Sequence, residues 1–129
     1  IHVAAAVIVG VDGNILIARR PDHVHKGGLW EFPGGKVEKG ETVQIALARE
    51  LEEELAISVL DTEPLLNVHH VYPEKAVWLD VWRVTKFSGE PRGNEGQLIT
   101  WVAVDQLDGY PFPEANQPII DALKLQSGL

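Results

Sequence analysis

Short apolar runs separated by polar turns make up most of the chain, and one longer segment has apolar residues at helical spacing. The first run, over 2–9, is rich in β-branched residues and predicts a buried strand. Turn residues at 11–14 lead into an apolar run over 15–18, which predicts the returning strand of a hairpin. A polar loop over 21–30 follows. The glycine pair 34–35 then predicts a tight bend where the backbone can come close to a ligand.

The segment from Glu41 to Leu55 is predicted to form a helix. Its Ala, Leu, Glu and Arg residues favour helix formation, and Thr42 is placed to cap the first turn. Apolar residues recur at every fourth position, so they form one stripe that faces the core. The residues of this stripe are Val43, Leu47, Leu51 and Leu55.

The second half of the chain predicts three more strands and a final helix. Strands are expected over 65–72 and 76–87, joined at 73–75, and the second is apolar on both faces, which is typical of a central strand. A further strand is expected over 98–104, and a helix over 114–125 closes the chain. Strands with helices on both faces predict an α/β sandwich with a mixed sheet. Three tryptophans in these strands are expected in the core, namely Trp78, Trp82 and Trp101.

Composition narrows the class of protein. The 129 residues suffice for one domain, which we expect to span 1–129, and the 11 basic and 19 acidic residues give a net charge of −8. Such a surface repels DNA and RNA, but divalent cations can join carboxylates to a small phosphorylated ligand. The chain has no cysteine, and no apolar run approaches the ~20 residues of a membrane helix. We therefore expect a cytoplasmic protein with no membrane partner, and the sequence does not indicate whether it has a protein partner.

Three glutamates gather on one side of the predicted helix. At about 100° per residue, Glu50, Glu53 and Glu54 fall within an arc of about 100° beside the leucine stripe, whereas Glu52 points away. Like charges at this spacing destabilise a helix, so the cluster requires compensation. Arg49 is placed to pair with Glu53, and Mg²⁺ or Mn²⁺ would be another source of positive charge. The alternative is a solvated acidic face with no bound metal.

The residues around this cluster favour the metal site. Gly35, five residues, Glu41, seven residues and then Arg49-Glu50-Leu51-x-Glu53-Glu54 resemble the Nudix box, GX5EX7REUXEEXGU, in which U is aliphatic. The one departure is Ala56, which stands where the family has the glycine that ends its helix. The likeness is to the MutT-like members of the family, and it covers nearly the whole chain. Its other segments are 19–20, 31–36, 89–97 and 112–118.

The resemblance implies a Nudix-type α/β/α sandwich that binds Mg²⁺, with Mn²⁺ as a substitute. Glu50 would contribute to the metal cluster and orient the attacking water, with Glu53 as the second catalytic carboxylate. Glu41 and Arg49 would form a structural pair beside Gly35. The implied metal ligands are the Gly34 carbonyl, Glu50, Glu53, Glu54 and Glu95. Read without the resemblance, Glu95 is an exposed glutamate in a flexible, glycine-flanked loop.

The resemblance also implies the reaction. Water would attack the β-phosphorus of a nucleoside triphosphate and release a nucleoside monophosphate and pyrophosphate. The expected substrate is 8-oxo-dGTP, whose removal protects the nucleotide pool. One alternative is a cytidine nucleotide such as CTP or 5-methyl-dCTP, and another is a Nudix domain that binds a nucleotide without turnover. Because the chain opens at Ile1 and has no methionine, we also expect a trimmed protein or a domain of a larger one.

For the base, the resemblance points to Arg20, His25, Glu31, Phe32, Pro33, Gly34 and Asn116. The Asn116 carboxamide offers one acceptor and two donors, so it can pair with both the N7 hydrogen and the O6 acceptor of 8-oxoguanine. Ordinary guanine has a bare N7, which would face an acceptor. The alternatives are that Asn116 caps the last helix and that His25 is solvated in its polar loop. We expect the loop from Arg20 to Trp30 to close over the nucleotide.

Overall fold

The structure, a computed structural model, describes residues 1–128. Its strands are β1 (His2–Ile8), β2 (Ile15–Arg19), β3 (Trp30–Glu31), β4 (Gly34–Lys36), β5 (Ser58–Val71), β6 (Ala76–Ser88) and β7 (Ile99–Val102). Its helices are α1 (Val43–Leu55) and α2 (Gln117–Gln126), with two short 3-10 helices, η1 (Val104–Gly109) and η2 (Glu114–Asn116). In this part of the chain no helix has the length and apolar character needed to cross a membrane.

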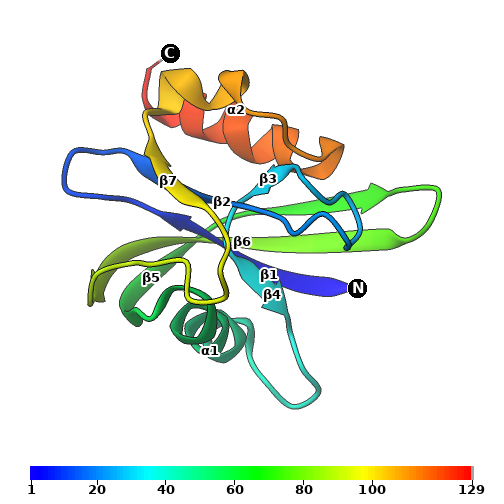
Figure 1. The fold of residues 1–129 in the computed structure, drawn as a ribbon, viewed down its shortest axis with the longest axis horizontal. Coiled ribbons are helices and arrows are strands. Elements are labelled where there is room, and N and C mark those ends of the chain that lie inside the picture. The colour runs from blue at the N-terminus through cyan, green and yellow to red at the C-terminus, as the bar shows by residue number, and fades with distance from the viewer. Residues whose placement is uncertain (129) are drawn as a thin grey trace.

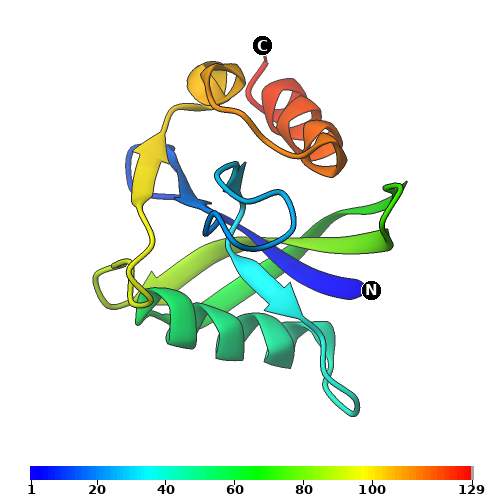
Figure 2. The same ribbon diagram turned by 45° about the vertical axis from the view of Figure 1, so that its right-hand side comes forward.

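The strands form two sheets. The larger has the order β4-β1-β6-β5, in which β1 and β6 are parallel and the other neighbours are antiparallel. The smaller sheet is antiparallel, with the order β3-β2-β7. Helix α1 lies on one side of the larger sheet and α2 on the other (Figure 1, Figure 2). These findings confirm the predicted α/β/α sandwich with a mixed sheet, and they place β6 between two strands, as its two apolar faces predict.

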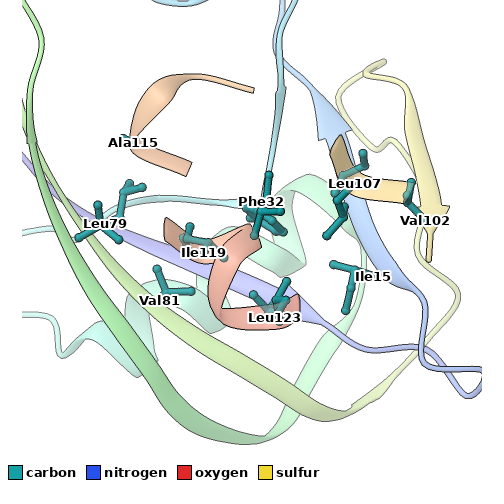
Figure 3. Packing of buried hydrophobic residues seen from close by; sticks show 14 of the residues in the cluster. Ile15, Phe32, Leu79, Val81, Val102, Leu107, Ala115, Ile119 and Leu123 are labelled. Carbon is teal, nitrogen blue, oxygen red and sulfur yellow. The ribbon is translucent and has the colours of Figure 1, made fainter. Parts of the chain in front are cut away.

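Strand β1 contributes to two separate cores. Successive side chains of a strand point to opposite faces. Ala4, Ala6 and Ile8 therefore pack with the leucines of α1, whereas Ala5 and Val7 belong to the core on the α2 side. Figure 3 shows residues of the α2-side core, among them Phe32, Leu79, Val81, Ile119 and Leu123.

Helix α1 is bounded by two local signals. The Thr42 hydroxyl oxygen accepts a hydrogen bond from the Ile45 backbone N–H at 3.2 Å, so the helix begins at Val43 rather than at the predicted Glu41. Three of the four residues of the predicted apolar stripe are fully buried. The helix ends at Ala56, whose φ of 59° and ψ of 34° lie in the left-handed region that favours glycine.

Several predicted boundaries were wrong. The short strands β3 and β4 were not predicted, because they are too short to show a periodicity; β3 lies at the end of the predicted polar loop and β4 at the glycine pair. Strand β5 begins at Ser58 rather than Leu65, since its polar first half forms a bulged edge of the sheet. The predicted strand over 98–104 is ordered as a strand only over Ile99–Val102. The predicted helix over 114–125 begins as η2 and becomes α-helical at Gln117.

The tryptophans also differ from the prediction. Trp101 is 37% exposed and lies in an edge strand against Gly10, so its assignment to the core was wrong. Trp82 packs against the core beneath α1, as predicted. Trp78 is half-buried and stacks on the His2 ring with 3.6 Å between ring centroids.

Candidate active site

The carboxylates of α1 face the glycine bend at β4. The Gly34 N–H donates a hydrogen bond to Glu54 Oε2 at 3.3 Å. A Cβ atom at Gly35 would lie 2.3 Å from Glu50 Cδ, and a Cβ atom at Gly34 would lie 1.9 Å from the Ala4 carbonyl oxygen. Gly34 therefore requires glycine, because its neighbour is the backbone of β1, whereas a side chain at position 35 would displace the Glu50 carboxylate.

Arg49 joins α1 to the segment that precedes it. Its Nε and Nη2 donate hydrogen bonds to the two carboxylate oxygens of Glu41 at 2.8 and 2.9 Å, and its Nη1 donates one to Glu50 Oε1 at 2.7 Å. Nη2 also donates a hydrogen bond to the Lys36 carbonyl oxygen at 3.1 Å. Glu53 is farther away, with its carboxylate 3.8 Å from Nη1. Arg49 therefore fixes the loop to the helix and neutralises Glu41 and Glu50 more fully than Glu53.

Glu54 stands in a strongly negative environment. Burial, followed by the charges of Glu31, Glu50 and Glu95, raises the pKa of Glu54 to about 9. Burial also raises the pKa of Glu50, although Arg49 opposes this effect. A carboxyl group with so high a pKa lacks a positive neighbour, and a divalent cation would supply one.

Glu95 reaches this region on a loop that is fastened to the end of α1. Asn94 Nδ2 donates a hydrogen bond to the Glu53 carbonyl oxygen, and Gln97 Nε2 donates one to the Glu54 carbonyl oxygen, both at 2.9 Å. Gln97 Oε1 accepts a hydrogen bond from the Glu95 N–H at 2.9 Å. Carbonyls at the end of a helix lack partners within it, and here side chains of the loop satisfy them. The glycine-flanked loop is therefore tied down on both sides of Glu95.

The predicted metal ligands offer only oxygen atoms, which suits a hard divalent cation. They are the Gly34 carbonyl and the carboxylates of Glu50, Glu53, Glu54 and Glu95. Within residues 1–128, no three Asp, Glu or His side chains are arranged so that they could hold a metal ion as they stand. The donor chemistry and the unbalanced negative charge fit a cation, and binding would require these side chains to move closer together.

A cavity of about 240 Å³ lies beside the acidic region, on the α2 side of the sheet. Six of the seven residues predicted to bind the base line it, namely Arg20, His25, Glu31, Phe32, Gly34 and Asn116. Pro33 does not line the cavity. It is buried, and its carbonyl oxygen accepts a hydrogen bond from the Ala6 N–H at 2.8 Å. The structure thus gathers residues from both ends of the chain around one cavity.

Asn116 occupies the N-cap position of α2, but its side chain makes no capping hydrogen bond. Its Nδ2 approaches the Pro113 carbonyl oxygen at 3.5 Å, and the residue is only 9% exposed. The alternative interpretation as a capping side chain is therefore wrong, and the carboxamide lines the cavity.

His25 is not a solvated loop residue. It is half-buried, and its Nε2 atom is shielded from solvent without a hydrogen-bond partner in residues 1–128. Burial and the nearby Lys75 lower the pKa of His25, which favours the neutral ring. A neutral imidazole nitrogen that lines a cavity can accept a hydrogen bond from a ligand or donate one to it.

Arg20 and Glu31 stand between this cavity and the acidic region. Arg20 Nη1 lies 2.5 Å from Glu31 Oε1, and Arg20 Nε donates a hydrogen bond to the His25 carbonyl oxygen at 2.8 Å. Both residues also line a second cavity, of about 340 Å³, with Glu54 and Glu95. Burial raises the pKa of Glu31, and Arg20 opposes this effect. The two cavities share Arg20 and Glu31, so they adjoin each other.

Comparison with known proteins identifies the family. A NUDIX domain model matches residues 4–122. The chain belongs to the Nudix family. It is 36% identical over 124 residues to an 8-oxo-dGTP diphosphatase of Escherichia coli K12, with 96% of each chain covered. It is 38% identical over 122 residues to a CTP pyrophosphohydrolase of the same organism, with 95% of this chain and 90% of the relative covered. A solved structure reported for MutT of Aliivibrio salmonicida and Vibrio cholerae superposes with a TM-score of 0.85 at 43% identity, covering 97% of both chains.

The protein is thus an enzyme, a Nudix hydrolase, and enzymes of this family generally need a divalent metal ion. Its Nudix box runs from β4 through the connecting loop to the end of α1. Sequence reasoning missed residues that support the site from elsewhere, namely Tyr72, Asn94 and Gln97. Their contacts with Ala115, Glu53 and Glu54 join residues at least 41 positions apart, and no short pattern in the sequence signals them.

Proposed function

We propose that this Nudix hydrolase converts 8-oxo-dGTP to 8-oxo-dGMP and pyrophosphate, with Mg²⁺ as its metal ion and Mn²⁺ as a substitute. The observation that carries this proposal is the Asn116 carboxamide, which lines the cavity without a helix-capping bond. Relatives named 8-oxo-dGTP diphosphatase that match nearly the whole chain support it. The reaction would keep an oxidised nucleotide out of DNA synthesis.

The proposed base preference follows from hydrogen-bond chemistry. The Asn116 oxygen would accept the N7 hydrogen of 8-oxoguanine while its NH₂ group donates to O6. With ordinary guanine, the Asn116 oxygen would face the bare N7 acceptor in a nearly buried position. Leaving a buried polar group unpaired costs about 1–3 kcal/mol, and a site built to pair with a substrate group can reject an analogue by on the order of 10⁴-fold.

The proposed catalytic roles fall on the acidic side. The Gly34 carbonyl, Glu50, Glu53, Glu54 and Glu95 would hold the metal. When bound, the ion would neutralise phosphate charge and lower the pKa of a coordinated water. Glu50 is held by Arg49 and by close packing against Gly35, so it is placed to orient the attacking water. Attack by water at the β-phosphorus would break the bond between the β-phosphorus and the bridging oxygen. That oxygen would leave as part of the nucleoside monophosphate, and the β- and γ-phosphates would leave as pyrophosphate.

The decisive experiment measures Mg²⁺-dependent pyrophosphate release from 8-oxo-dGTP, dGTP and 5-methyl-dCTP side by side. We expect a strong preference for 8-oxo-dGTP. We also expect Glu53→Gln to lower the rate by roughly 100-fold or more, because even indirect support of a metal ligand is worth 10–100-fold. Glu52→Gln, an exposed neighbour on the same helix, is the matched control and should retain the wild-type rate.

Other outcomes would change the proposal in defined ways. The likeness to a CTP pyrophosphohydrolase makes a cytidine nucleotide the second candidate, and faster release from 5-methyl-dCTP would establish it. No release from any of the three would contradict the proposal and favour a Nudix domain that binds nucleotides without turnover. The presence of Glu50, Glu53 and Glu54 supports turnover.

We also propose that residues 1–129 form one domain that works in the cytoplasm. The family match over 4–122 supports the single domain, and β1 contributes to both cores. Free nucleotides are the proposed substrates, and the enzyme would encounter the pool of free nucleotides in the cytoplasm.

A further inference from the structure

Tyr72 follows the last residue of β5 and lines the base cavity, although neither the sequence motif nor the proposed chemistry gives it a role. Its side chain is almost fully buried, at 5% exposure for the residue. The Tyr72 N–H donates a hydrogen bond to the Lys75 carbonyl oxygen at 2.8 Å, and the Lys75 N–H donates one to the Tyr72 carbonyl oxygen at 3.2 Å. The ring is therefore carried by a closed turn at the end of the β5–β6 hairpin.

The Tyr72 hydroxyl reaches the turn that carries Asn116. Its oxygen accepts a hydrogen bond from the Ala115 backbone N–H at 2.9 Å, and Ala115 is 3% exposed in the same core as Leu79 (Figure 3). Ala115 lies in η2, at the start of the helical segment that continues into α2, where the first N–H groups have no partner within the helix. A buried N–H without a partner is costly, so this bond fixes the turn.

The helix start itself leaves the Asn116 side chain free to serve the cavity. A residue at an N-cap position ordinarily uses its side chain to accept a hydrogen bond from an N–H group two or three residues later. Here the residue two positions later is Pro118, which has no N–H, and the Gln117 N–H already bonds to the Glu114 carbonyl oxygen. The Asn116 carboxamide makes no capping bond and lines the cavity instead.

The Tyr72 ring also touches the loop on the other side of the cavity. The His25 ring meets it edge-on, with 5.2 Å between centroids, and Lys26 Nζ lies 4.7 Å from its centroid. One side chain thus contacts both the loop that carries His25 and the turn that carries Asn116. A second link to that turn, between His70 and Glu114 at 3.4 Å, involves a largely exposed carboxylate and contributes little.

We propose that Tyr72 is a positioning residue for base selection, because its hydroxyl holds the turn that orients Asn116. This inference rests on the proposed function of the cavity. Tyr72→Phe keeps the ring and its packing and removes only the bond to Ala115. We expect the preference for 8-oxo-dGTP over dGTP, measured as a ratio of kcat/KM values, to fall about tenfold, which is typical for one lost buried hydrogen bond. The loss should appear in KM, with kcat for 8-oxo-dGTP unchanged, because the carboxylates lie on α1.

The test combines this kinetic comparison with amide hydrogen exchange of the substrate-free protein. In Tyr72→Phe the Ala115 amide should exchange about tenfold faster than in the wild type. Tyr110→Phe is the matched control, since Tyr110 is the only other tyrosine and its hydroxyl makes no hydrogen bond within the described chain. It should leave both the Ala115 exchange rate and the nucleotide preference unchanged.

Three results would overturn the inference. An Ala115 amide that exchanges at the wild-type rate in Tyr72→Phe would show that the hydroxyl does not hold the turn. Faster exchange with an unchanged nucleotide preference would show that the bond is structural only, and the proposed function would stand. A wild-type enzyme that does not distinguish 8-oxo-dGTP from dGTP would overturn the proposed function, and this inference with it.

Discussion

The amide of Asn116 is the single group on which base preference is proposed to depend. Asn116→Ala would remove both hydrogen bonds to the base edge, so we expect kcat/KM for 8-oxo-dGTP to fall roughly 100-fold and that for dGTP to change much less. Steady-state kinetics with both nucleotides measure this. Asn67→Ala is the control, because Asn67 is exposed and pairs with Trp78 away from the cavity. An equal loss for both nucleotides would contradict the role proposed for Asn116.

Ala56 is strained by the way α1 ends. A left-handed conformation costs an L-residue about 1–2 kcal/mol, whereas glycine adopts it freely but loses more entropy on folding. The balance predicts that Ala56→Gly stabilises the fold by about 0.5–1 kcal/mol and raises the Tm by roughly 3 °C. Thermal unfolding measures this shift, and an unchanged or lower Tm would show that the strain is relieved elsewhere.

Single residues were predictable where they act within one helix. That Glu50, Glu53 and Glu54 share one face follows from spacing alone, since helical geometry fixes which positions lie together. Their assignment to a metal site rests on the resemblance to the Nudix box. Asn94, Gln97 and Tyr72 act on residues more than 40 positions away, and only the folded chain brings such groups together. The Asn116 side chain could not be assigned between capping and cavity, because the choice depends on how η2 continues into α2.

At the scale of elements, the contact between β4 and α1 sets the position of Glu50. Gly35→Ala would place a Cβ atom 2.3 Å from Glu50 Cδ and force the Glu50 carboxylate out of its present position. We expect kcat to fall roughly 100-fold, since small displacements of a catalytic group have effects of this size. Gly109→Ala is the control, because a Cβ atom there meets nothing within 4 Å. Near-normal activity of Gly35→Ala would mean that Glu50 does not need this position.

Elements with strong, long periodicity were predicted well, and short ones were not. The stripe of α1 spans 13 residues, and the apolar residues on the two faces of β6 span eight, from Val77 to Val84. Strand β3 has two residues and β4 has three, so their pairing partners, rather than their own patterns, make them strands. The first half of β5 was missed because it is a polar, bulged edge that pairs only with β6.

For the whole molecule, the acidic cluster ties stability to pH and metal. The pKa of Glu54 is about 9 in the folded protein against an ordinary value of 4.5. Between these values the folded chain keeps a proton at Glu54 that the unfolded chain releases, so stability falls as pH rises. Without metal, we expect a smaller loss of stability between pH 6 and pH 9 in Glu54→Gln than in the wild type, measured by urea unfolding.

Two comparisons complete this test. Glu52→Gln should show the wild-type loss of stability, because Glu52 is exposed on the same helix. Saturating Mg²⁺ should reduce the loss in the wild type, since a cation favours the charged form of Glu54. Identical pH dependence in Glu54→Gln and the wild type would show that Glu54 does not hold its proton in the folded state.

The two helices stand on opposite sides of β1, and this separation has a consequence for how such enzymes diversify. The α1 layer carries most of the proposed reaction chemistry, the α2 layer carries Asn116, and the two regions share Arg20, Glu31 and Gly34. Under the proposed roles, we expect substitutions in the α2 layer to change which base is accepted without disturbing the carboxylates. Relatives of similar identity are named for 8-oxo-dGTP and for CTP. Related enzymes with this arrangement can therefore keep the same reaction while they evolve to act on different nucleotides.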